Sequence, residues 1–238
     1  MIKVQNLKKI YGDRCVLDVP EYNFKSGVIY GLLGRNGAGK TTLVNIITNR
    51  VFASSGTCTV NDLPVYENDY AQSNIFCITE QSTYPAYLKV KDTFKWAKMF
   101  YPSFDTDYAL ELSQKFDLDI NKRFKQLSTG YRTIAKVVLT LASETPVMIL
   151  DEPVLGIDAL YRKVFYTELL KTHKKLNNLV LLATHIMDEA ESVVEHVIVL
   201  RNGIMVKDDT LKNVVGNHNS LQDAYVALHE SELGGASN

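Results

Sequence analysis

The sequence contains few cysteines and very little net charge. Cys15, Cys58 and Cys77 are widely separated and form no Cys-x-x-Cys pair, which predicts buried, reduced thiols rather than a disulfide or a metal site. The 26 basic and 27 acidic residues leave a formal charge of −1. Because there is no basic surplus, we expect no binding to nucleic acid or to acidic membrane surfaces through bulk charge.

Long hydrophobic runs are also missing. Crossing a bilayer takes about 20 consecutive apolar residues, and stretches such as 137–142 and 179–183 are far shorter. Residues 1–7 alternate as a first strand would and lack the charged-then-apolar layout of a signal peptide. We therefore expect a soluble protein that stays in the cytosol.

The most informative feature that is present is a glycine-rich loop directly after the apolar run 28–33. The loop reads Gly34-Arg35-Asn36-Gly37-Ala38-Gly39-Lys40-Thr41-Thr42. Successive N–H groups of such a P-loop surround nucleotide phosphates, and a Cβ at its glycines would block that approach. Lys40 suits the β- and γ-phosphates, and the Thr41 hydroxyl suits Mg²⁺. A strand before the loop and a helix over 41–48 complete the predicted nucleotide site.

The hydrophobic periodicity indicates an α/β core interrupted by a helical segment. The first 60 residues or so read as strands around the P-loop, and the middle of the chain reads as helices. Apolar strands are then predicted at 147–150, 179–183 and 197–200. We expect one domain over residues 1–230, with the helical insertion at about 84–142 and a disordered tail at 231–238.

A second motif places two carboxylates at the end of a strand. Residues 147–150 are apolar and are followed by Asp151, Glu152 and Pro153. In open α/β sheets, ligands bind beyond the carboxyl ends of the strands. Asp151 suits the Mg²⁺ shell, and Glu152 suits a general base for the water that attacks a phosphate.

A third motif, Leu127-Ser128-Thr129-Gly130-Tyr131, opens the helical run that precedes this strand. Ser128 suits a helix N-cap, where a hydroxyl and free N–H groups can meet an anion. In this position the motif resembles the Leu-Ser-Gly-Gly-Gln signature of the ATP-binding cassette (ABC) family. The resemblance implies an α/β fold with a P-loop NTPase core of the ABC-ATPase type, a mainly helical signature subdomain and an N-terminal antiparallel β portion.

The resemblance extends over residues 2–228 and implies further roles. Tyr11 matches the aromatic that stacks on adenine, His185 the switch histidine at the γ-phosphate, and Asp158 the D-loop that crosses a dimer interface. Glu80 and Gln81 both fall at the Q-loop, and either could fill its role. In the family, the signature contacts ATP held on the P-loop of a second subunit. The implied cofactors are ATP and Mg²⁺, and the implied reaction is ATP hydrolysis.

The implied partners are a second ATPase subunit and a separate integral-membrane permease, which would hold the chain peripherally on the cytoplasmic face of the cell membrane. Residues 220–228 resemble the closing helix of ATPases in ABC-2-type exporters. Residues 99–105 are similar to those of ATPases in Gram-positive antimicrobial-peptide and phenol-soluble modulin exporters. The aromatic residues after Gln81 are predicted either to form a docking groove for a cytoplasmic permease helix or to pack in the core.

The sequence departs from the family pattern at three positions, and two other classes of protein are alternatives to a transporter ATPase. The signature has Thr129 for Gly and Tyr131 for Gln, and the D-loop has Ile157 for Leu. One alternative is a soluble ABC ATPase outside transport, acting on nucleic acid or ribosomes; such translation factors carry two cassettes, whereas this chain has one. The second alternative is a P-loop kinase or GTPase. That interpretation leaves the signature motif unexplained, and the sequence contains no Asn-Lys-x-Asp motif for guanine recognition.

Overall fold

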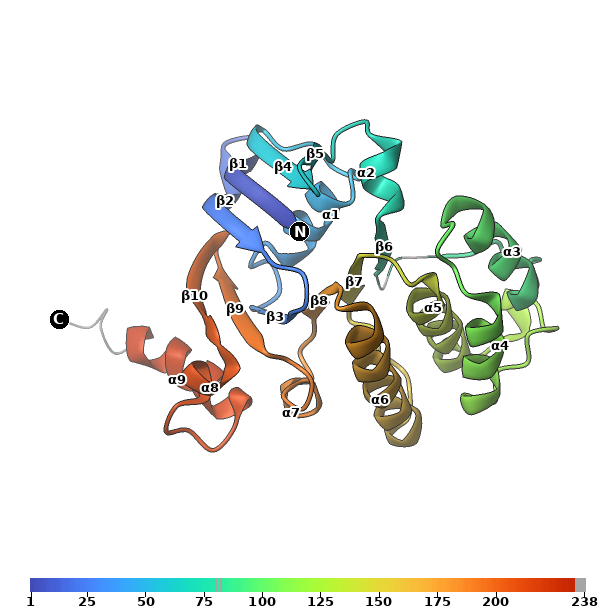
Figure 1. The fold of residues 1–238 in the computed structure, drawn as a ribbon. Helices are drawn as coiled ribbons and strands as arrows, with labels where there is room; N and C mark the ends of the chain where they lie inside the picture. The colour runs from blue at the N-terminus through green and yellow to red at the C-terminus, as the bar shows by residue number, and fades with distance from the viewer. Residues whose placement is uncertain (80, 82, 234–238) are drawn as a thin grey trace.

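The computed structural model describes residues 1–79, 81 and 83–233, and it contains two sheets with helices around them (Figure 1). The smaller sheet is antiparallel and lies at the N-terminal end, with strand order β2-β1-β4-β5. Its strands are β1 (Ile2–Tyr11), β2 (Arg14–Phe24), β4 (Ser55–Val60) and β5 (Leu63–Pro64). This matches the predicted β portion, and Gly12 and Asp13 separate β1 from β2.

The alternation predicted for the first strand is interrupted at Asn6. Ile2, Val4 and Leu7 are buried, so the inward positions change phase between Val4 and Leu7. Asn6 has a φ of 49°, and the pairing of β1 with β4 shifts register between Gln5 and Lys8. A left-handed residue and a bulge of this kind reorient a strand, which puts Leu7 back into the core.

The larger sheet carries the predicted functional motifs, with strand order β10-β9-β3-β8-β7-β6. All neighbouring pairs are parallel except β10 with β9. Its strands are β3 (Ile29–Leu33), β6 (Ile75–Ile78), β7 (Val147–Asp151), β8 (Leu179–Ala183), β9 (His196–Arg201) and β10 (Ile204–Thr210). Each apolar run predicted as a core strand is one of these.

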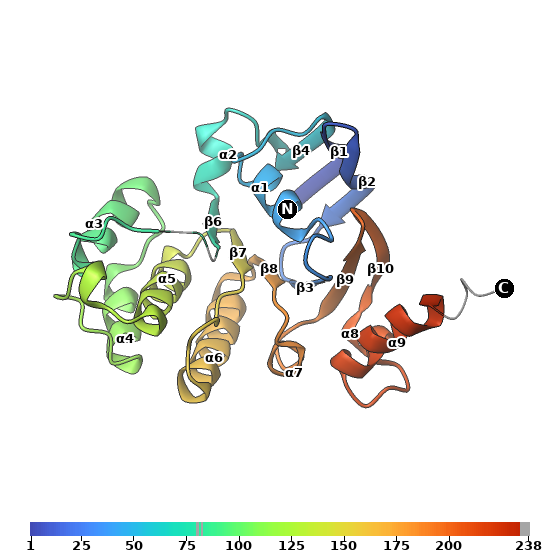
Figure 2. The same cartoon turned by 180° about the vertical axis from the view of Figure 1, so that it is seen from behind.

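Helices cover both faces of this sheet. The helices of the chain are α1 (Lys40–Ile47), α2 (Asp69–Ser73), α3 (Val90–Phe100), α4 (Thr106–Lys115), α5 (Thr129–Ser143), α6 (Ala159–Leu176), α7 (Met187–Ala190), α8 (Leu211–Val215) and α9 (Leu221–Leu233), with a short 3₁₀ turn at Phe124–Gln126. Seen from behind, α3, α4 and α5 gather at the end of the molecule opposite α8 and α9 (Figure 2). The expected helical insertion is therefore present.

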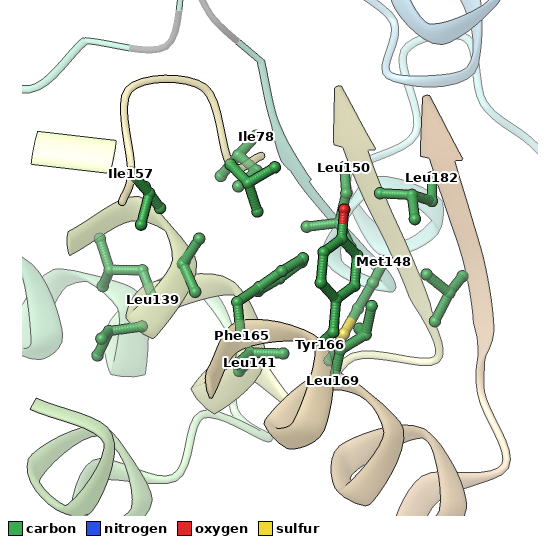
Figure 3. Packing of buried hydrophobic residues seen from close by; sticks show 14 of the residues in the cluster. Ile78, Leu139, Leu141, Met148, Leu150, Ile157, Phe165, Tyr166, Leu169 and Leu182 are labelled. Carbon is green, nitrogen blue, oxygen red and sulfur yellow. The ribbon is translucent and has the colours of Figure 1, made fainter. Parts of the chain in front are cut away.

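Alternation along the strands divides the core into two clusters. On β7, Met148 and Leu150 belong to the cluster formed with α5 and α6, while Val147 and Ile149 belong to the cluster formed with α1 and the small sheet. Figure 3 shows Phe165, Tyr166 and neighbouring side chains of the first cluster against β7 and β8. Both faces of the central parallel strands are therefore buried, as parallel strands require.

The C-terminal helix is longer than the sequence predicts. α9 continues past Leu228 and ends at Leu233. Residues 234–238 lie outside the described residues, and disorder there stays a prediction.

Candidate nucleotide site

The P-loop connects β3 to α1 and leaves the first turn of α1 open to an anion. Gly39 is the N-cap of α1 with a φ of 109°, and no side chain in the described part of the chain caps this helix. A Cβ on Gly39 would lie 3.0 Å from the Val16 carbonyl oxygen. Glycine is therefore required both by the backbone conformation and by the close approach to β2. The free N–H groups at the start of α1 suit phosphate oxygens.

Lys40 lies under this loop with its ammonium partly buried. Its Nζ donates to the carbonyl oxygens of Gly34 and Arg35, the second at 3.2 Å. Burial lowers the pKa of Lys40, while the charges of Glu152 and Asp151 raise it. The ammonium is thus held between its own loop and the two carboxylates predicted from the second motif.

The two carboxylates come to the P-loop because β7 and β3 end on the same edge of the sheet. Asp151 is the last residue of β7, and β8 alone separates β7 from β3. One cleft is lined by Asp151, Glu152 and residues 35–42. Arg35, Asn36, Gly37, Ala38, Gly39, Lys40, Thr41 and Thr42 are all in this lining, as the sequence predicts, and Gly34 lines the adjoining cleft.

Glu152 is held by residues that follow β8. His185 Nδ1 lies 2.9 Å from Glu152 Oε2, and the Thr184 hydroxyl donates to the same oxygen at 3.2 Å. Glu152 has a φ of 50°, and its N–H donates to the Ala183 carbonyl at 2.8 Å. This arrangement joins the predicted base to the predicted switch histidine. Thr184 was not singled out in the sequence, where a threonine after a strand carries no distinctive signal.

Tyr11 and Arg14 lie on the β1–β2 hairpin at the side of the cleft. Tyr11 is 51% exposed and has the Lys9 ammonium 4.7 Å above its ring, so one face of the ring is already covered. Tyr11 does not line the cleft, whereas Arg14 does. Arg14 is a residue that the sequence interpretation missed; its only signal is its place three residues after Tyr11.

The signature lies away from this cleft. Ser128 is the N-cap of α5, as predicted, and its hydroxyl accepts the Tyr131 N–H at 3.3 Å. None of Leu127, Ser128, Thr129, Gly130, Tyr131 or Asp158 lines the P-loop cleft in the described part of the chain. A Cβ at Gly130 would lie 2.6 Å from the Gly156 carbonyl oxygen, so the D-loop backbone packs closely against this glycine.

The Q-loop follows β6 and can be described only in part. Gln81 is exposed, and Glu80 lies outside the described residues. The choice between Glu80 and Gln81 therefore stays a prediction.

The donor set for Mg²⁺ is small. Thr41 and Asp151 line the same cleft, and the described residues contain no group of three or more His, Cys, Asp or Glu side chains arranged to hold a metal ion. Mg²⁺ commonly binds through one or two carboxylates together with water and substrate phosphates. A hydroxyl and a carboxylate beside a phosphate cradle fit that chemistry.

Comparison with known proteins decides the family of this chain. A model described as "ABC transporter" matches residues 17–155, which include the P-loop, the signature and both carboxylates. The chain belongs to the ABC transporter family. It is an ATP-binding ATPase subunit of that family. In the described part of the chain, no helix combines the length and the hydrophobicity needed to span a bilayer.

Relatives and solved structures agree with this assignment. The chain is 28% identical to the ABC transporter ATP-binding protein YtrB of Bacillus subtilis, over 96% of this chain and 76% of the relative. It is 30% identical to the lantibiotic transport ATP-binding protein SrtF of Streptococcus pyogenes, over 83% of this chain and 85% of the relative. It is also 30% identical to the tungstate uptake ATP-binding protein TupC of Peptoclostridium acidaminophilum, over 85% and 95%. A solved ATP-binding subunit of an ABC transporter shares the fold with a TM-score of 0.87 and 24% identity, over 96% of this chain and 99% of that chain.

Proposed function

We propose that this ABC ATPase powers export through a separate membrane permease, and that two copies sandwich ATP between the P-loop of one and the signature of the other. The separation of two phosphate-binding features within one chain supports this pairing of two copies. The P-loop, Asp151 and Glu152 line one cleft, and His185 is paired with Glu152. Ser128, Gly130 and Asp158 do not line the clefts formed by the P-loop, and Thr129 lines a separate pocket that also includes Asp151 and Glu152. One chain thus offers a phosphate cradle and, apart from it, a helix N-cap suited to a second phosphate.

The roles within the cleft follow from the chemistry of phosphoryl transfer, which requires mainly positioning and charge stabilisation. Glu152 orients and deprotonates the attacking water, since its carboxylate is at the cleft and is fixed by Thr184. His185, on the same oxygen of Glu152, contacts the γ-phosphate. Tyr11 stacks on adenine through the ring face opposite Lys9.

Mg²⁺ would be held by Thr41 and Asp151 together with the phosphates of ATP. When bound, the ion neutralises charge that develops on the phosphate oxygens. Thr41 is positioned for this by the first turn of α1, and Asp151 by the end of β7.

ATP would act as the bond between the copies. Shifting a pair from about 1:99 to 99:1 closed takes roughly 5.5 kcal/mol of differential binding. Charge-assisted contacts from Ser128, the first turn of α5 and His185 at two sites can supply free energy of that order. Hydrolysis removes the γ-phosphate contacts and reopens the pair.

Export is supported by relatives of this kind, including the lantibiotic transport protein SrtF, and by the resemblance of residues 220–228 to ABC-2 exporter ATPases. TupC belongs to an uptake system, so import is the competing direction. The substrate class that the exporter relatives suggest is a peptide or hydrophobic compound.

The permease would dock on the helical end of the molecule and hold the chain on the cytoplasmic face of the membrane. The aromatic residues after Gln81 fall into three groups. Phe94 and Phe104 are buried in the core, Tyr84 and Tyr101 are half-buried and pack against it, and Tyr87, Trp96 and Phe100 are between 43% and 69% exposed. Core packing therefore accounts for the first two groups, and the exposed group, with Met99, is the surface proposed for a cytoplasmic helix of the permease.

Replacement of Glu152 tests the site and the pairing together. We expect Glu152→Gln to keep the ATP dissociation constant, to lower hydrolysis by at least about 100-fold, and to accumulate a dimer with ATP in size-exclusion chromatography. Glu21→Gln, at an exposed position on β2, is the matched control and should behave as the parent chain. Normal turnover in Glu152→Gln would refute Glu152 as the base.

The transport role needs a separate test. We expect the chain to co-purify from membranes with a multi-span partner, and replacement of Trp96, Met99 and Phe100 by serine to release it while leaving ATP binding intact. Retention of the partner by that variant would contradict the docking surface. A chain that is never recovered with a membrane protein would favour the soluble ABC ATPase instead.

A further inference from the structure

Three segments that are remote in sequence meet at Tyr161, near the start of α6. The Tyr161 hydroxyl donates to Asp117 Oδ2 at 2.8 Å, in the turn after α4. Its N–H donates to Asp158 Oδ1 at 3.1 Å, in the D-loop. Its ring lies 6.4 Å from the ring of Tyr131, at 60°. Tyr161 therefore touches the helical subdomain, the D-loop and the last residue of the signature.

A second set of contacts joins the same two motifs directly. The Thr133 hydroxyl, one turn into α5, donates to the Leu155 carbonyl at 3.2 Å, in addition to its bond with the Thr129 carbonyl. The backbone of Gly156 packs so closely on Gly130 that a Cβ there would lie 2.6 Å from the Gly156 oxygen. Backbone packing, a hydroxyl bond and an aromatic pair thus fasten the signature turn to residues 155–161.

These contacts account for the residue at position 131. The family signature has glutamine there, and this chain has a tyrosine whose ring packs beside the core and against Tyr161. The Tyr161 hydroxyl, like any phenol with a pKa of about 10 or more, is protonated at neutral pH and can donate to Asp117. Its bonds to Asp117 and then to Tyr131 raise this pKa further. Tyr131 is therefore engaged within its own chain.

The D-loop is in turn continuous with the catalytic carboxylate. The Leu155 N–H donates to the Glu152 carbonyl at 3.4 Å, and the Ile157 N–H to the Val154 carbonyl at 3.1 Å. Val154 is fully buried and Ile157 is 5% exposed. A compact, anchored turn of this kind transmits displacement because packed side chains leave it little freedom to absorb it.

We propose that Tyr161 and Thr133 are positioning residues that make the signature turn and the D-loop of one chain a single unit, so that contact of the signature with ATP on a second copy is passed to Glu152 of its own chain. This rests on the ATP-sandwich pairing proposed above. The consequence is positive coupling between the two ATP sites of a pair. Neither residue lines the P-loop cleft, and Thr133 lines a separate pocket that also includes Asp151 and Glu152.

The test uses two variants with closely matched controls. Tyr161→Phe removes the hydroxyl, and Tyr22→Phe removes a similar tyrosine–aspartate bond of 2.7 Å to Asp208, far from the signature. Thr133→Val removes a hydroxyl that donates both to the Thr129 carbonyl of its own helix and to the Leu155 carbonyl of the D-loop. Its control, Thr167→Val, removes a hydroxyl that donates only to the Lys163 carbonyl within α6.

In the Glu152→Gln background, we expect Tyr161→Phe and Thr133→Val each to raise the ATP concentration for half-maximal dimerisation by about fivefold, as loss of a hydrogen bond implies. Binding of ATP to the single chain should not change, and both controls should dimerise as the parent does. With Glu152 restored, the Hill coefficient of hydrolysis should fall toward one in the two test variants only. Midpoints and Hill coefficients equal to those of the controls would overturn the proposal.

Hydrogen exchange on the nucleotide-free single chain separates this proposal from the pairing. We expect faster exchange of the amides at 131–134 in Tyr161→Phe and Thr133→Val, and parental exchange in Tyr22→Phe and Thr167→Val. Unchanged exchange in the test variants would overturn the coupled unit, whether or not the chain forms dimers. A different result would be faster exchange in the test variants while Glu152→Gln forms no ATP-dependent dimer. That result would support the contact between signature turn and D-loop, but it would contradict the ATP-sandwich pairing and therefore the proposed effect of the second copy on Glu152.

Discussion

Glu152 shows how a single residue can be positioned by backbone conformation and by neighbours from another strand. A positive φ is uncommon for glutamate, and here it accompanies a backbone bond to Ala183 together with contacts from Thr184 and His185. Such conformations persist only where surrounding contacts support them, and they are concentrated at functional sites. The loop after β8 therefore determines where the carboxylate of β7 points.

Thr184 gives a prediction at this scale. Thr184→Val removes the hydroxyl that donates to Glu152 and leaves its oxygen with one partner fewer. We expect kcat to fall by about tenfold with little change in KM, because about 1.4 kcal/mol of transition-state positioning corresponds to tenfold in rate. Steady-state ATPase kinetics measure both constants. Thr184→Ser keeps the hydroxyl and should retain most activity; an equal loss in both variants would contradict a role for the hydroxyl.

The sequence located the motif residues better than their supporting residues. Lys40, Asp151 and Glu152 could be predicted because a loop after an apolar strand must emerge at the sheet edge. Thr184 and Tyr161 could not, because their contacts join segments far apart in the chain, such as Tyr161 and Asp117, and no local pattern records such a pairing. The packing of Gly156 on Gly130 could not be predicted for the same reason, since the two residues approach each other only in the folded chain.

At the scale of elements, α4 and α6 are joined by a buried charge. The Glu168 side chain is 5% exposed and lies 3.1 Å from Lys115 Nζ of α4 and 2.6 Å from Lys171 Nζ. Burial raises the pKa of Glu168, but the bonds to Lys171 and Lys115 outweigh it and the net pKa is lowered. This contact connects the helical subdomain to the catalytic core.

Because the pKa of Glu168 is lower in the folded chain, its contribution to stability is present above its ordinary pKa of 4.5 and is lost as pH falls through the folded value. We expect Glu168→Gln to lower the free energy of unfolding at pH 7 by about 1–3 kcal/mol. The difference from the parent should shrink below about pH 4.5. Urea unfolding at several pH values measures it.

Glu111→Gln is the control for this prediction, because Glu111 also pairs with Lys115, at 2.6 Å, but is exposed. It should cost less than about 1 kcal/mol. A Glu168→Gln effect that is the same at pH 3 and pH 7 would contradict the ionic explanation. The sequence predicted helices in the middle of the chain, where α4 lies, but it could not predict this contact, because a glutamate in a helical pattern reads as exposed.

At the scale of the whole molecule, the helical subdomain does not have a core of its own. Phe94, Phe104 and Phe116 belong to the same buried cluster as Met148 and Leu150 of the catalytic sheet. The sequence indicated a separate helical insertion by its change of periodicity, but the extent of packing between the parts depends on side chains that meet only in three dimensions. The expected single domain over residues 1–230 remains a prediction, which unfolding can test.

We expect one cooperative thermal unfolding transition for the whole chain, because unfolding of the helical subdomain would expose the core face of β7. Differential scanning calorimetry should give a heat-capacity change of about 3 kcal/mol/K for a chain of this length. The calorimetric and van't Hoff enthalpies should agree. Two resolved transitions would show that the subdomains unfold independently.

Lys40 has a consequence for how this protein is studied. Its ammonium donates to the carbonyl oxygens of Gly34 and Arg35, so this lysine also ties together its own loop. A variant without the lysine consequently changes two properties at once, and its lost activity reports on the order of the loop as well as on affinity for ATP.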